Sequence, residues 1–481
     1  MKVSKDLFFN ILNSLSIVLF PLLTFPYASR ILGPEGIGVV SFAENFCRYF
    51  MLFAALGIPI YGIREISKVS HDLFKRSKIF FEILIIHLIT TLICIIFYCI
   101  IIFNVLEFND YKTIYLLGIF YIFSNVLSIE WFFNGLSEFK FIAIRSILIK
   151  LIFVALLFLL VKTKTDVFWY FALNVLLLLF NNIINLFYLR SKISIHLINL
   201  DLIRHLKPLL YIFSTTVAVS LYVLIDTIIL GFYKEAEIVG YYALSIRLNK
   251  VPLVIVVALG TVLIPKLTKA AHDQDFNQFK GLIKKSTDFV IMIGVPVTFV
   301  LFICSKPLIM LFGGVEFLHA DATIKIMSSL ALLIGLSNLY GMQILTPLGK
   351  DKELLKCVTF GTICSLILDF LLIPMFAEKG AALANVFSEI VVTVSTYLLA
   401  KKVINIQQPI KIIGVHFLLY CPTAIFCFII EKHFYSDVVF GLFAVSLIGL
   451  TFVITNLFIL KTSLALETLN LVKKYCKYEK V

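Results

Sequence analysis

The sequence predicts an all-α protein that crosses a membrane about fourteen times. Of its 481 residues, 60% are hydrophobic and only 15% are charged, and the mean hydropathy is +1.01. A water-soluble domain has about 25% charged residues, because its surface must be hydrated. Apolar runs of about 20 residues, long enough to span the hydrocarbon core as helices, recur from end to end. The alternating segments of about ten residues that indicate a membrane β-barrel do not occur.

The apolar runs define the expected helices in order. The first run, from about Leu7 to Ser29, is too long for the core of a signal peptide and lacks a small-residue cleavage site. We therefore interpret it as the first span. Fourteen spans are expected, at residues 8–29, 37–60, 79–103, 113–133, 142–161, 166–189, 208–232, 238–264, 287–311, 320–346, 354–374, 380–400, 412–430 and 437–460.

Basic residues alternate between the loops that these spans define. The two tails and the even-to-odd loops, counted with their flanking ends, hold 29 of the 42 Lys and Arg residues, whereas the opposite loops hold seven. Because Lys and Arg accumulate on the cytoplasmic side of membrane proteins, both termini are expected in the cytoplasm. The net charge of +13 then reports topology, and nucleic acid is not an expected partner.

The loops and cysteines offer no chemistry of their own. The loops around 190–207 and 265–286 and the tail after Lys461 are short, basic and amphipathic, so we expect interfacial helices or solvated connectors there. The nine cysteines show no paired spacing, which argues against a disulfide framework or a metal site. No nucleotide-binding loop or nucleophile elbow is present, so no catalytic residue is expected.

Two pairs of similar segments indicate an internal repeat. Residues 27–48, YASRILGPEGIGVVSFAENFCR, resemble residues 224–250, LIDTIILGFYKEAEIVGYYALSIRLNK, and residues 124–136 resemble residues 337–349. The first alignment, at an offset of 202 residues, pairs Gly38 with Gly240, Asn45 with Arg247 and Arg48 with Lys250.

The repeat predicts the domain organisation. Its two copies leave the cytoplasm in the same direction, as parallel repeats do when an axis along the membrane normal relates them and a cavity lies between them. We expect a six-helix bundle at 1–190, a cytoplasmic linker at 191–207, a second six-helix bundle at 208–403, two additional transmembrane helices at 404–461 and a cytoplasmic tail at 462–481.

Cations dominate the ionisable residues at mid-depth of the predicted spans. Such residues are costly in hydrocarbon and face a bundle interior or a water-filled cavity. Arg48 follows Glu44 by four residues on one helical face, and Arg247 and Lys250 share another face. These three cations outnumber the nearby acids Glu44 and Asp226, so we expect them to bind an anionic substrate. A phosphate suits them, since an arginine can hold it through two hydrogen bonds.

Four further residues in the spans have competing interpretations. Lys150 either extends the basic path or snorkels to the cytoplasmic interface. Asp226 either neutralises Arg247, nearly level with it across a short hairpin, or takes part in cation coupling. Glu130 is a candidate for gating or for a helix-end ion pair, and Glu44 joins Asp226 and Glu130 as a coupling candidate.

The aromatic neighbour of Glu130 has a simpler interpretation. Trp131 follows Glu130 at the cytoplasmic end of the fourth predicted span. Tryptophan is enriched at the interface between membrane and water. We therefore expect Trp131 to be an interfacial anchor.

Three stretches resemble a known family. They are YASRILGPEGIGVVSFAENF (27–46), IEWFFNGLSEFKFIAIRSILIK (129–150) and LIDTIILGFYKEAEIVGYYALSIRLNKVPLVIVVALGTVLIPKLTKA (224–270). The family is that of the Wzx-type polysaccharide-transport proteins, the O-antigen and capsule repeat-unit flippases of the multidrug/oligosaccharidyl-lipid/polysaccharide exporter superfamily. The similarity runs in order from about residue 8 to residue 400.

The resemblance implies a function without covalent chemistry. Such proteins move undecaprenyl-diphosphate-linked oligosaccharides from the inner to the outer leaflet of the bacterial cytoplasmic membrane, by alternating access between two six-helix bundles. We expect the lipid-linked glycan and membrane lipids as partners, together with the polysaccharide polymerase and chain-length regulator. No cofactor is expected beyond a coupling ion, H⁺ or Na⁺.

Three alternatives remain open. A cation-coupled multidrug exporter would carry an acidic, aromatic cavity, whereas the mid-depth charges here are mainly basic. A lipid II or teichoic-type flippase is suggested by the two extra helices. A membrane glycosyltransferase or polymerase would need catalytic carboxylates and usually a large periplasmic loop, and every outer loop in this sequence is short.

Overall fold

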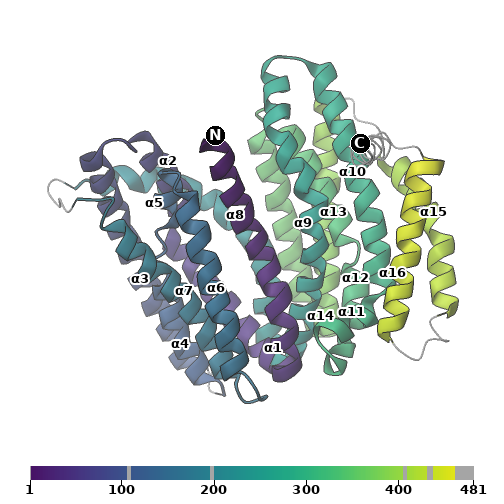
Figure 1. Cartoon of the computed structure of the whole chain (residues 1–481), viewed down its shortest axis with the longest axis horizontal. Coiled ribbons are helices and arrows are strands. Elements are labelled where there is room, and N and C mark those ends of the chain that lie inside the picture. Colours follow the sequence, from purple (N-terminus) through teal and green to yellow (C-terminus); the bar gives the residue numbers. More distant parts are fainter. Residues whose placement is uncertain (1, 106–109, 195–199, 405–408, 431–436, 461–481) are drawn as a thin grey trace, which may run out of the picture. The chain divides into compact units, whose positions relative to one another are not determined.

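The computed structural model describes residues 2–105, 110–194, 200–404, 409–430 and 437–460. Every regular element in these ranges is helical, which confirms the all-α prediction. Contacts within the chain divide it into two compact units, Met1–Gly240 and Tyr241–Val481, and Figure 1 labels the helices of both.

The first unit is built around a long broken helix, α1. Two helical legs of α1, residues 2–32 and 34–55, are separated at Gly33, where φ is 70° and ψ is −178°. Glycine adopts a positive φ at little cost, because it has no Cβ. The unit comprises α1 (Lys2–Ala55), α2 (Ile58–Lys68), α3 (Leu73–Asn104), α4 (Lys112–Phe123), α5 (Glu130–Gly135), α6 (Phe139–Leu160), α7 (Val167–Leu189), α8 (Ile203–Tyr233) and the start of α9 (Ala236–His272).

The order of contacts shows that the chain reverses direction at Gly33. The first leg runs parallel to α6, through the pairs Ser16–Lys150, Phe20–Phe153 and Tyr27–Val161. The second leg runs antiparallel to α3, through Cys47–Tyr98 and Ala54–Thr90. It is parallel to α4, through Glu35–Tyr111 and Met51–Asn125. It is antiparallel to α8, through Phe42–Gly231 and Phe53–Phe213.

The second unit continues the same alternation. In α14 the backbone breaks at Ala377, and Gly361 lies against Val392 across the break, so α14 also consists of two antiparallel legs. The unit comprises the rest of α9, α10 (Phe276–Ile303), α11 (Ser305–Phe312), η2 (Val315–Ala320), α12 (Asp321–Met327), α13 (Leu330–Asn338), η3 (Leu339–Leu345), α14 (Asp351–Val403), α15 (Pro409–Ile430), α16 (Asp437–Val453) and η5 (Ile454–Ile459).

The number of crossings agrees with the sequence prediction. Ten helical segments of the described residues are long and apolar enough to cross a membrane. The segments of α1 and α14 each reverse direction and so count twice; α4 is a shorter apolar helix, and α8 is a further helix of 31 residues. These elements together give about fourteen crossings.

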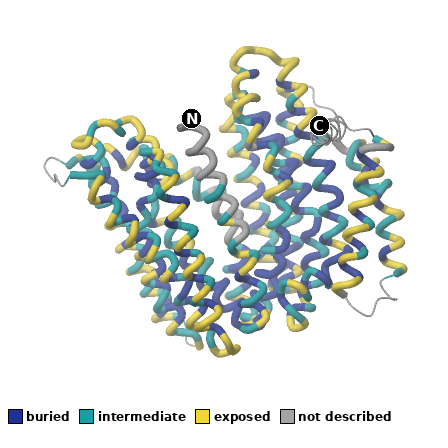
Figure 2. Tube along the Cα trace, viewed as in Figure 1, coloured by how far each residue is buried: buried dark blue, intermediate teal, exposed yellow. Residues whose placement is uncertain are grey.

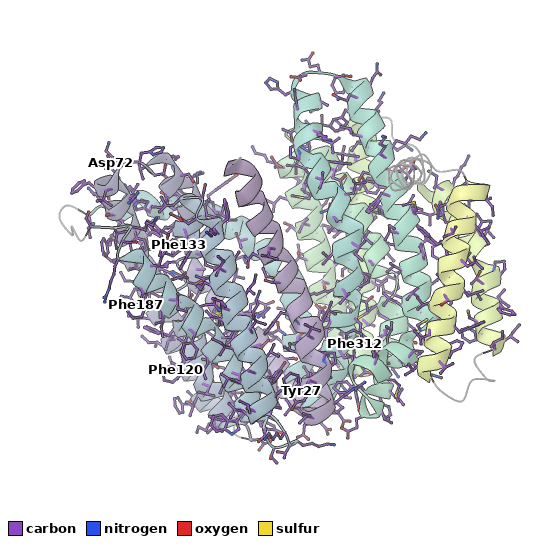
Figure 3. All side chains as sticks on the ribbon, in the orientation of Figure 1. Tyr27, Asp72, Phe120, Phe133, Phe187 and Phe312 are labelled. Carbon is purple, nitrogen blue, oxygen red and sulfur yellow. The ribbon has the colours of Figure 1, made fainter. Side chains whose placement is uncertain are left out.

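Burial within each unit shows which surfaces face lipid. Many outer helix faces are exposed (Figure 2), and on α3 the exposed residues form an apolar stripe. A water-soluble monomer rarely exposes so much contiguous apolar surface, so this stripe belongs in hydrocarbon. The stripe consists of Leu88, Ile89, Leu92, Ile93, Ile96, Phe97, Ile100 and Phe103. The two ends of the first unit are marked by Tyr27 and Asp72, which lie at opposite ends of it (Figure 3).

The loop at 265–286 does not form the separate interfacial helix that was one of its two predicted interpretations. Residues 265–286 form a hairpin in which α9 continues to His272 and α10 already begins at Phe276, eleven residues before the predicted span. The Asp275 carboxylate accepts the Gln278 N–H and caps α10. Hydropathy locates only the segment within lipid, whereas backbone hydrogen bonding continues through polar residues in water.

The other predicted interfacial segments are not helical where the structure describes them. Residues 190–194 and 200–202 form turns and irregular chain before α8, and residues 195–199 lie outside the described ranges. The expected tail, 462–481, also lies outside them.

The expectation that Trp131 anchors the interface is wrong. Its side chain is buried and stacks on Phe80, with ring centroids 5.7 Å apart. It also covers Gly62 of α2, where a Cβ would lie 2.3 Å from the indole. The apolar runs did not predict α2, because α2 carries charged residues on its exposed face, and this helix covers the tryptophan.

Candidate functional site

The repeat has a structural counterpart at the start of α9, inside the first unit. A Cβ built on Gly38 would lie 1.6 Å from the Ala236 carbonyl oxygen, and one on Gly240 would lie 2.0 Å from the Pro34 carbonyl oxygen. The offset of 202 maps Gly38 onto Gly240 and Pro34 onto Ala236. Within the first unit, the contacts Gly38–Ala236 and Pro34–Gly240 therefore join residues that the 202-residue offset maps onto one another.

Arg48 lies about two-thirds of the way along the second leg of α1. Its side chain is 52% exposed, and its Nη2 lies 3.8 Å from Oε2 of Glu44, whose side chain is 13% exposed. This distance is longer than a hydrogen bond. The Arg48 side chain also contacts Tyr121 of α4. The Arg48 guanidinium thus lies beside Glu44 and Tyr121, while about half of the side chain is exposed.

Asn45 lies on the same stretch of α1. Its amide donates to the Ser41 carbonyl at 2.9 Å. Ser41 is buried, whereas Asn45 is half-buried. The Asn45 amide is therefore hydrogen-bonded within α1.

The repeat partners of these residues have matching exposure. Lys250 in α9 is exposed, as Arg48 is, and Arg247 is half-buried, as Asn45 is. Asp226 in α8 is only 2% exposed. Asp226 belongs to the first unit and Arg247 to the second, so their pairing stays a prediction.

Lys150 bridges two helices of the first unit. Its ammonium group donates to the Ser16 hydroxyl at 2.8 Å and lies 5.9 Å from the centre of the Phe20 ring. Lys150 is half-buried where α6 packs along the first leg of α1. Its ammonium group is therefore held between α6 and α1, about three turns from the start of α6.

Glu130 begins α5 and forms an ion pair with Arg145 of α6. The Arg145 side chain is 2% exposed, and it also donates to the Asn185 side-chain oxygen of α7. The sequence analysis missed Arg145, because its position near a predicted helix end grouped it with the cytoplasmic cations. Its place inside an apolar run was the signal that could have identified it.

A second network that the sequence analysis missed surrounds Glu82 of α3, which is fully buried. Its Oε1 accepts the Asp201 N–H at 2.7 Å, and its Oε2 lies 2.9 Å from His205 Nε2 and also accepts from Arg204. The network fastens the start of α8 to α3. Glu82 and His205 are 123 residues apart, so no local pattern could have paired them.

The linker before α8 is fastened at the same end of the unit. Lys192 donates to Glu138 at 2.5 Å, and this hydrogen bond raises the pKa of Lys192 above its usual value. Arg76 of α3 donates to the Lys192 carbonyl at 2.9 Å. The Ser194 N–H donates to the Ser77 hydroxyl at 2.9 Å.

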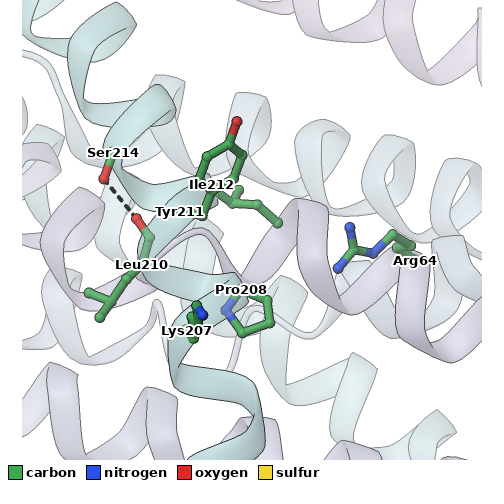
Figure 4. A pocket seen from close by; sticks show the side chains of 7 residues that line it. All are labelled: Arg64, Lys207, Pro208, Leu210, Tyr211, Ile212 and Ser214. Atoms are coloured by element: carbon green, nitrogen blue, oxygen red, sulfur yellow. Dashed lines mark hydrogen bonds between the residues drawn. The ribbon is translucent and has the colours of Figure 1, made fainter.

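A groove lies between α2 and α8, close to the network around Glu82 (Figure 4). Its volume is about 540 Å³. Arg64 projects into it from α2, and Lys207 lies near it at the start of α8. Its remaining lining is mostly apolar: Pro208, Leu210, Tyr211, Ile212 and Ser214.

Comparisons with known proteins identify the family. Residues 3–271, more than half of the chain, match the model of the family described as "Polysaccharide biosynthesis protein". The chain is 28% identical over 382 residues to a putative O-antigen transporter of Escherichia coli K12, covering 78% of this chain and 91% of that protein. It is 24% identical over 380 residues to the capsular polysaccharide biosynthesis protein CapF of Staphylococcus aureus, covering 77% and 92%.

A solved structure shares the fold. The lipid II flippase MurJ, in an inward closed conformation, superposes with a TM-score of 0.70 at 16% sequence identity, over 94% of this chain and 98% of that chain. This likeness agrees with the all-α, multi-pass architecture. The resemblance to Wzx-type polysaccharide transporters is thereby confirmed, and the chain belongs to the polysaccharide biosynthesis protein family of multi-pass membrane proteins.

Proposed function

We propose that this protein is a flippase for lipid-linked oligosaccharides. It would carry undecaprenyl-diphosphate-linked repeat units from the inner to the outer leaflet of the bacterial cytoplasmic membrane, with both of its termini in the cytoplasm. The proposal is supported by relatives whose names describe O-antigen transport and capsule synthesis. The proposed transport forms and breaks no covalent bond, so the protein would act as a transporter and not as an enzyme.

The observation that carries the proposal is the environment of Arg48. It lies well inside a membrane helix, yet half of its side chain is exposed, and the Glu44 carboxylate beside it is 3.8 Å away. A cation in such a place is costly unless water or an anion reaches it. A diphosphate head group supplies that anion, while its polyprenyl chain stays in the lipid.

The repeat extends this reasoning to the second unit. Lys250 is equivalent to Arg48 and is also exposed, and Arg247 lies three residues before it. We propose that Arg48, Arg247 and Lys250 bind the diphosphate, with Lys150 farther along the path. Parallel repeats permit the site to open to either side by alternating access.

The energy source in this proposal is an ion gradient, of H⁺ or Na⁺. Asp226 is the first candidate, because a buried carboxylate in a membrane helix is a typical coupling group. Glu44 and Glu130 are further candidates, although Glu130 already pairs with Arg145. Transport at equal rates by an Asp226→Asn variant, at all proton and sodium gradients, would exclude the coupling role.

Proposed partners follow from the same chemistry. The lipid-linked precursor arrives in the membrane from the enzymes that build it. On the outer leaflet the polysaccharide polymerase and its chain-length regulator would use the product.

Substitution of the cavity cations tests the proposed function. Arg48→Ala and Lys250→Ala should abolish surface polysaccharide while leaving membrane insertion intact, because each removes a charge that binds the head group. Arg190→Ala is the matched control, since Arg190 is exposed at the end of α7 and packs on Phe187. Wild-type surface polysaccharide in both cavity variants would remove these residues from the transport path.

A further inference from the structure

We infer that the groove between α2 and α8 binds an anionic phospholipid of the cytoplasmic leaflet, with its phosphate between Arg64 and Lys207. The groove lies outside the set of mid-depth cations to which we assign transport. It is at the end of the first unit where the second leg of α1 finishes, and a Cβ on Gly57 there would lie 2.9 Å from Ile212. By the charge distribution of the loops, this end faces the cytoplasm.

Its charge is positive and only partly neutralised. Arg64 Nε lies 3.2 Å from Glu65 Oε1, and the same oxygen accepts from Lys68 Nζ at 2.8 Å. One carboxylate thus serves two cations. Among the residues that the structure describes, Arg64 donates only through Nε, so its terminal amino groups are left for a ligand.

Lys207 adds a second charge from the opposite wall. It is exposed in the first turns of α8, and no described residue forms an ion pair with it. Two cations on separate helices match one phosphate diester better than either would alone. Basic pockets between membrane helices on the cytoplasmic side bind anionic lipid head groups by this arrangement.

The apolar lining explains why the ligand is a lipid and not free phosphate. Leu210 and Tyr211 are 51% and 73% exposed, and Pro208 and Ile212 complete the surface next to Lys207. An acyl chain would cover these side chains, whereas an inorganic anion would leave them bare. The groove therefore combines a basic end, which suits the phosphate of a phospholipid, with an apolar wall, which suits its acyl chain.

The two walls are held in place before a lipid arrives. The Tyr61 hydroxyl of α2 lies 2.7 Å from His205 Nδ1 of α8, and His205 in turn contacts buried Glu82. The Arg64 guanidinium lies 5.3 Å from the centre of the Tyr61 ring. Because these contacts fix α2 against α8, little ordering is needed when the lipid binds.

Lipid retention by the purified full-length protein tests this inference. Binding of phosphatidylglycerol would be measured by native mass spectrometry for the wild type and for the Arg64→Gln/Lys207→Gln double variant. We expect affinity to fall roughly 30-fold, about 5-fold to 6-fold for each basic residue lost. Lys140→Gln is the matched control, because Lys140 is an exposed cation at the start of α6 that neither lines the groove nor shares a carboxylate with Arg64.

Three further arms decide between ligand sources. Phosphatidylcholine should bind no better to the wild type than to the double variant, and inorganic phosphate should not displace phosphatidylglycerol. Undecaprenyl diphosphate should not compete at this groove. Equal phosphatidylglycerol retention by wild type and double variant would overturn the inference, and so would displacement by inorganic phosphate or by undecaprenyl diphosphate.

The experiment does not depend on transport. Both substituted side chains are exposed, so the double variant should fold, and an unchanged melting temperature without added lipid would verify this. The single charge reversal Lys207→Glu should lower phosphatidylglycerol binding further than Lys207→Gln. A failure of the flippase assignment would leave these binding results unchanged.

Discussion

The crossing of the two repeats at Gly38 and Gly240 leads to a sharp prediction for Gly38→Ala. The added Cβ would lie 1.6 Å from the Ala236 carbonyl oxygen, whereas ordinary contacts begin at 3.4 Å. The second leg of α1 and the start of α9 must therefore separate locally by about 1.8 Å. Overpacking of this kind costs ~1–3 kcal/mol, and the neighbouring atoms here are backbone, which cannot rotate away.

A helix-propensity gain opposes that cost. Alanine in place of glycine in a helix interior contributes about 0.5–1 kcal/mol, so Gly38→Ala should destabilise by up to about 2.5 kcal/mol net. Gly281→Ala in α10 is the matched control, because a Cβ there meets nothing within 4 Å. That variant should be neutral or slightly stabilised.

Thermal unfolding of the detergent-purified protein is the assay. The reciprocal contact requires that Gly240→Ala should melt at a lower temperature too, since its Cβ would lie 2.0 Å from the Pro34 carbonyl oxygen. Melting temperatures of Gly38→Ala and Gly240→Ala equal to that of Gly281→Ala would refute the close approach of the two backbones at these glycines.

Two other predictions concern groups outside the transport path. Glu82→Gln should destabilise the protein by roughly 2–4 kcal/mol, because it leaves Arg204 and His205 facing a neutral amide in a buried network; an unchanged melting temperature would contradict this. Asp166 accepts the N–H groups of Lys162 and Thr163, and these hydrogen bonds lower its pKa. The ionised Asp166 carboxylate should therefore stabilise the folded protein at pH values above the ordinary carboxyl pKa of about 4. This stabilisation should disappear as the pH falls through the lower pKa that Asp166 has in the folded protein. The melting-temperature difference between wild type and Asp166→Asn should therefore vanish in strong acid, and a constant difference with pH would argue against the predicted linkage.

The helices could be predicted because each crossing carries its own signal. An apolar run marks the span, and basic loops mark its direction, so even the reversal at Gly33 inside α1 was expected between two predicted spans. The boundary of α10 could not be predicted, because its first turns are polar and leave no hydropathy signal.

The candidate site was predictable only in part. Arg48 and Lys250 stand out as cations in apolar runs, and the structure describes both as exposed. Arg145 is also a cation in an apolar run, but it is buried between Glu130 and Asn185. Exposure depends on which face of the helix meets a neighbour, and one sequence does not reveal that neighbour.

Glu82 and Lys207 show a second limit. Their surroundings come from segments far apart in the chain, such as Glu82 in α3 and His205 in α8. The groove near Lys207 needs α2, a short helix whose charged residues hide it from a hydropathy scan. Long-range contacts of this kind became visible only in the folded chain.

Reconstituted transport tests the central claim most directly. The purified protein would be placed in liposomes with an undecaprenyl-diphosphate-linked oligosaccharide on one leaflet and an ion gradient across the membrane, and a glycan-binding probe would report arrival on the other leaflet. We predict that the wild type speeds this transfer and that Arg48→Ala does not. Transfer by the wild type no faster than in protein-free liposomes, under both proton and sodium gradients, would contradict the account.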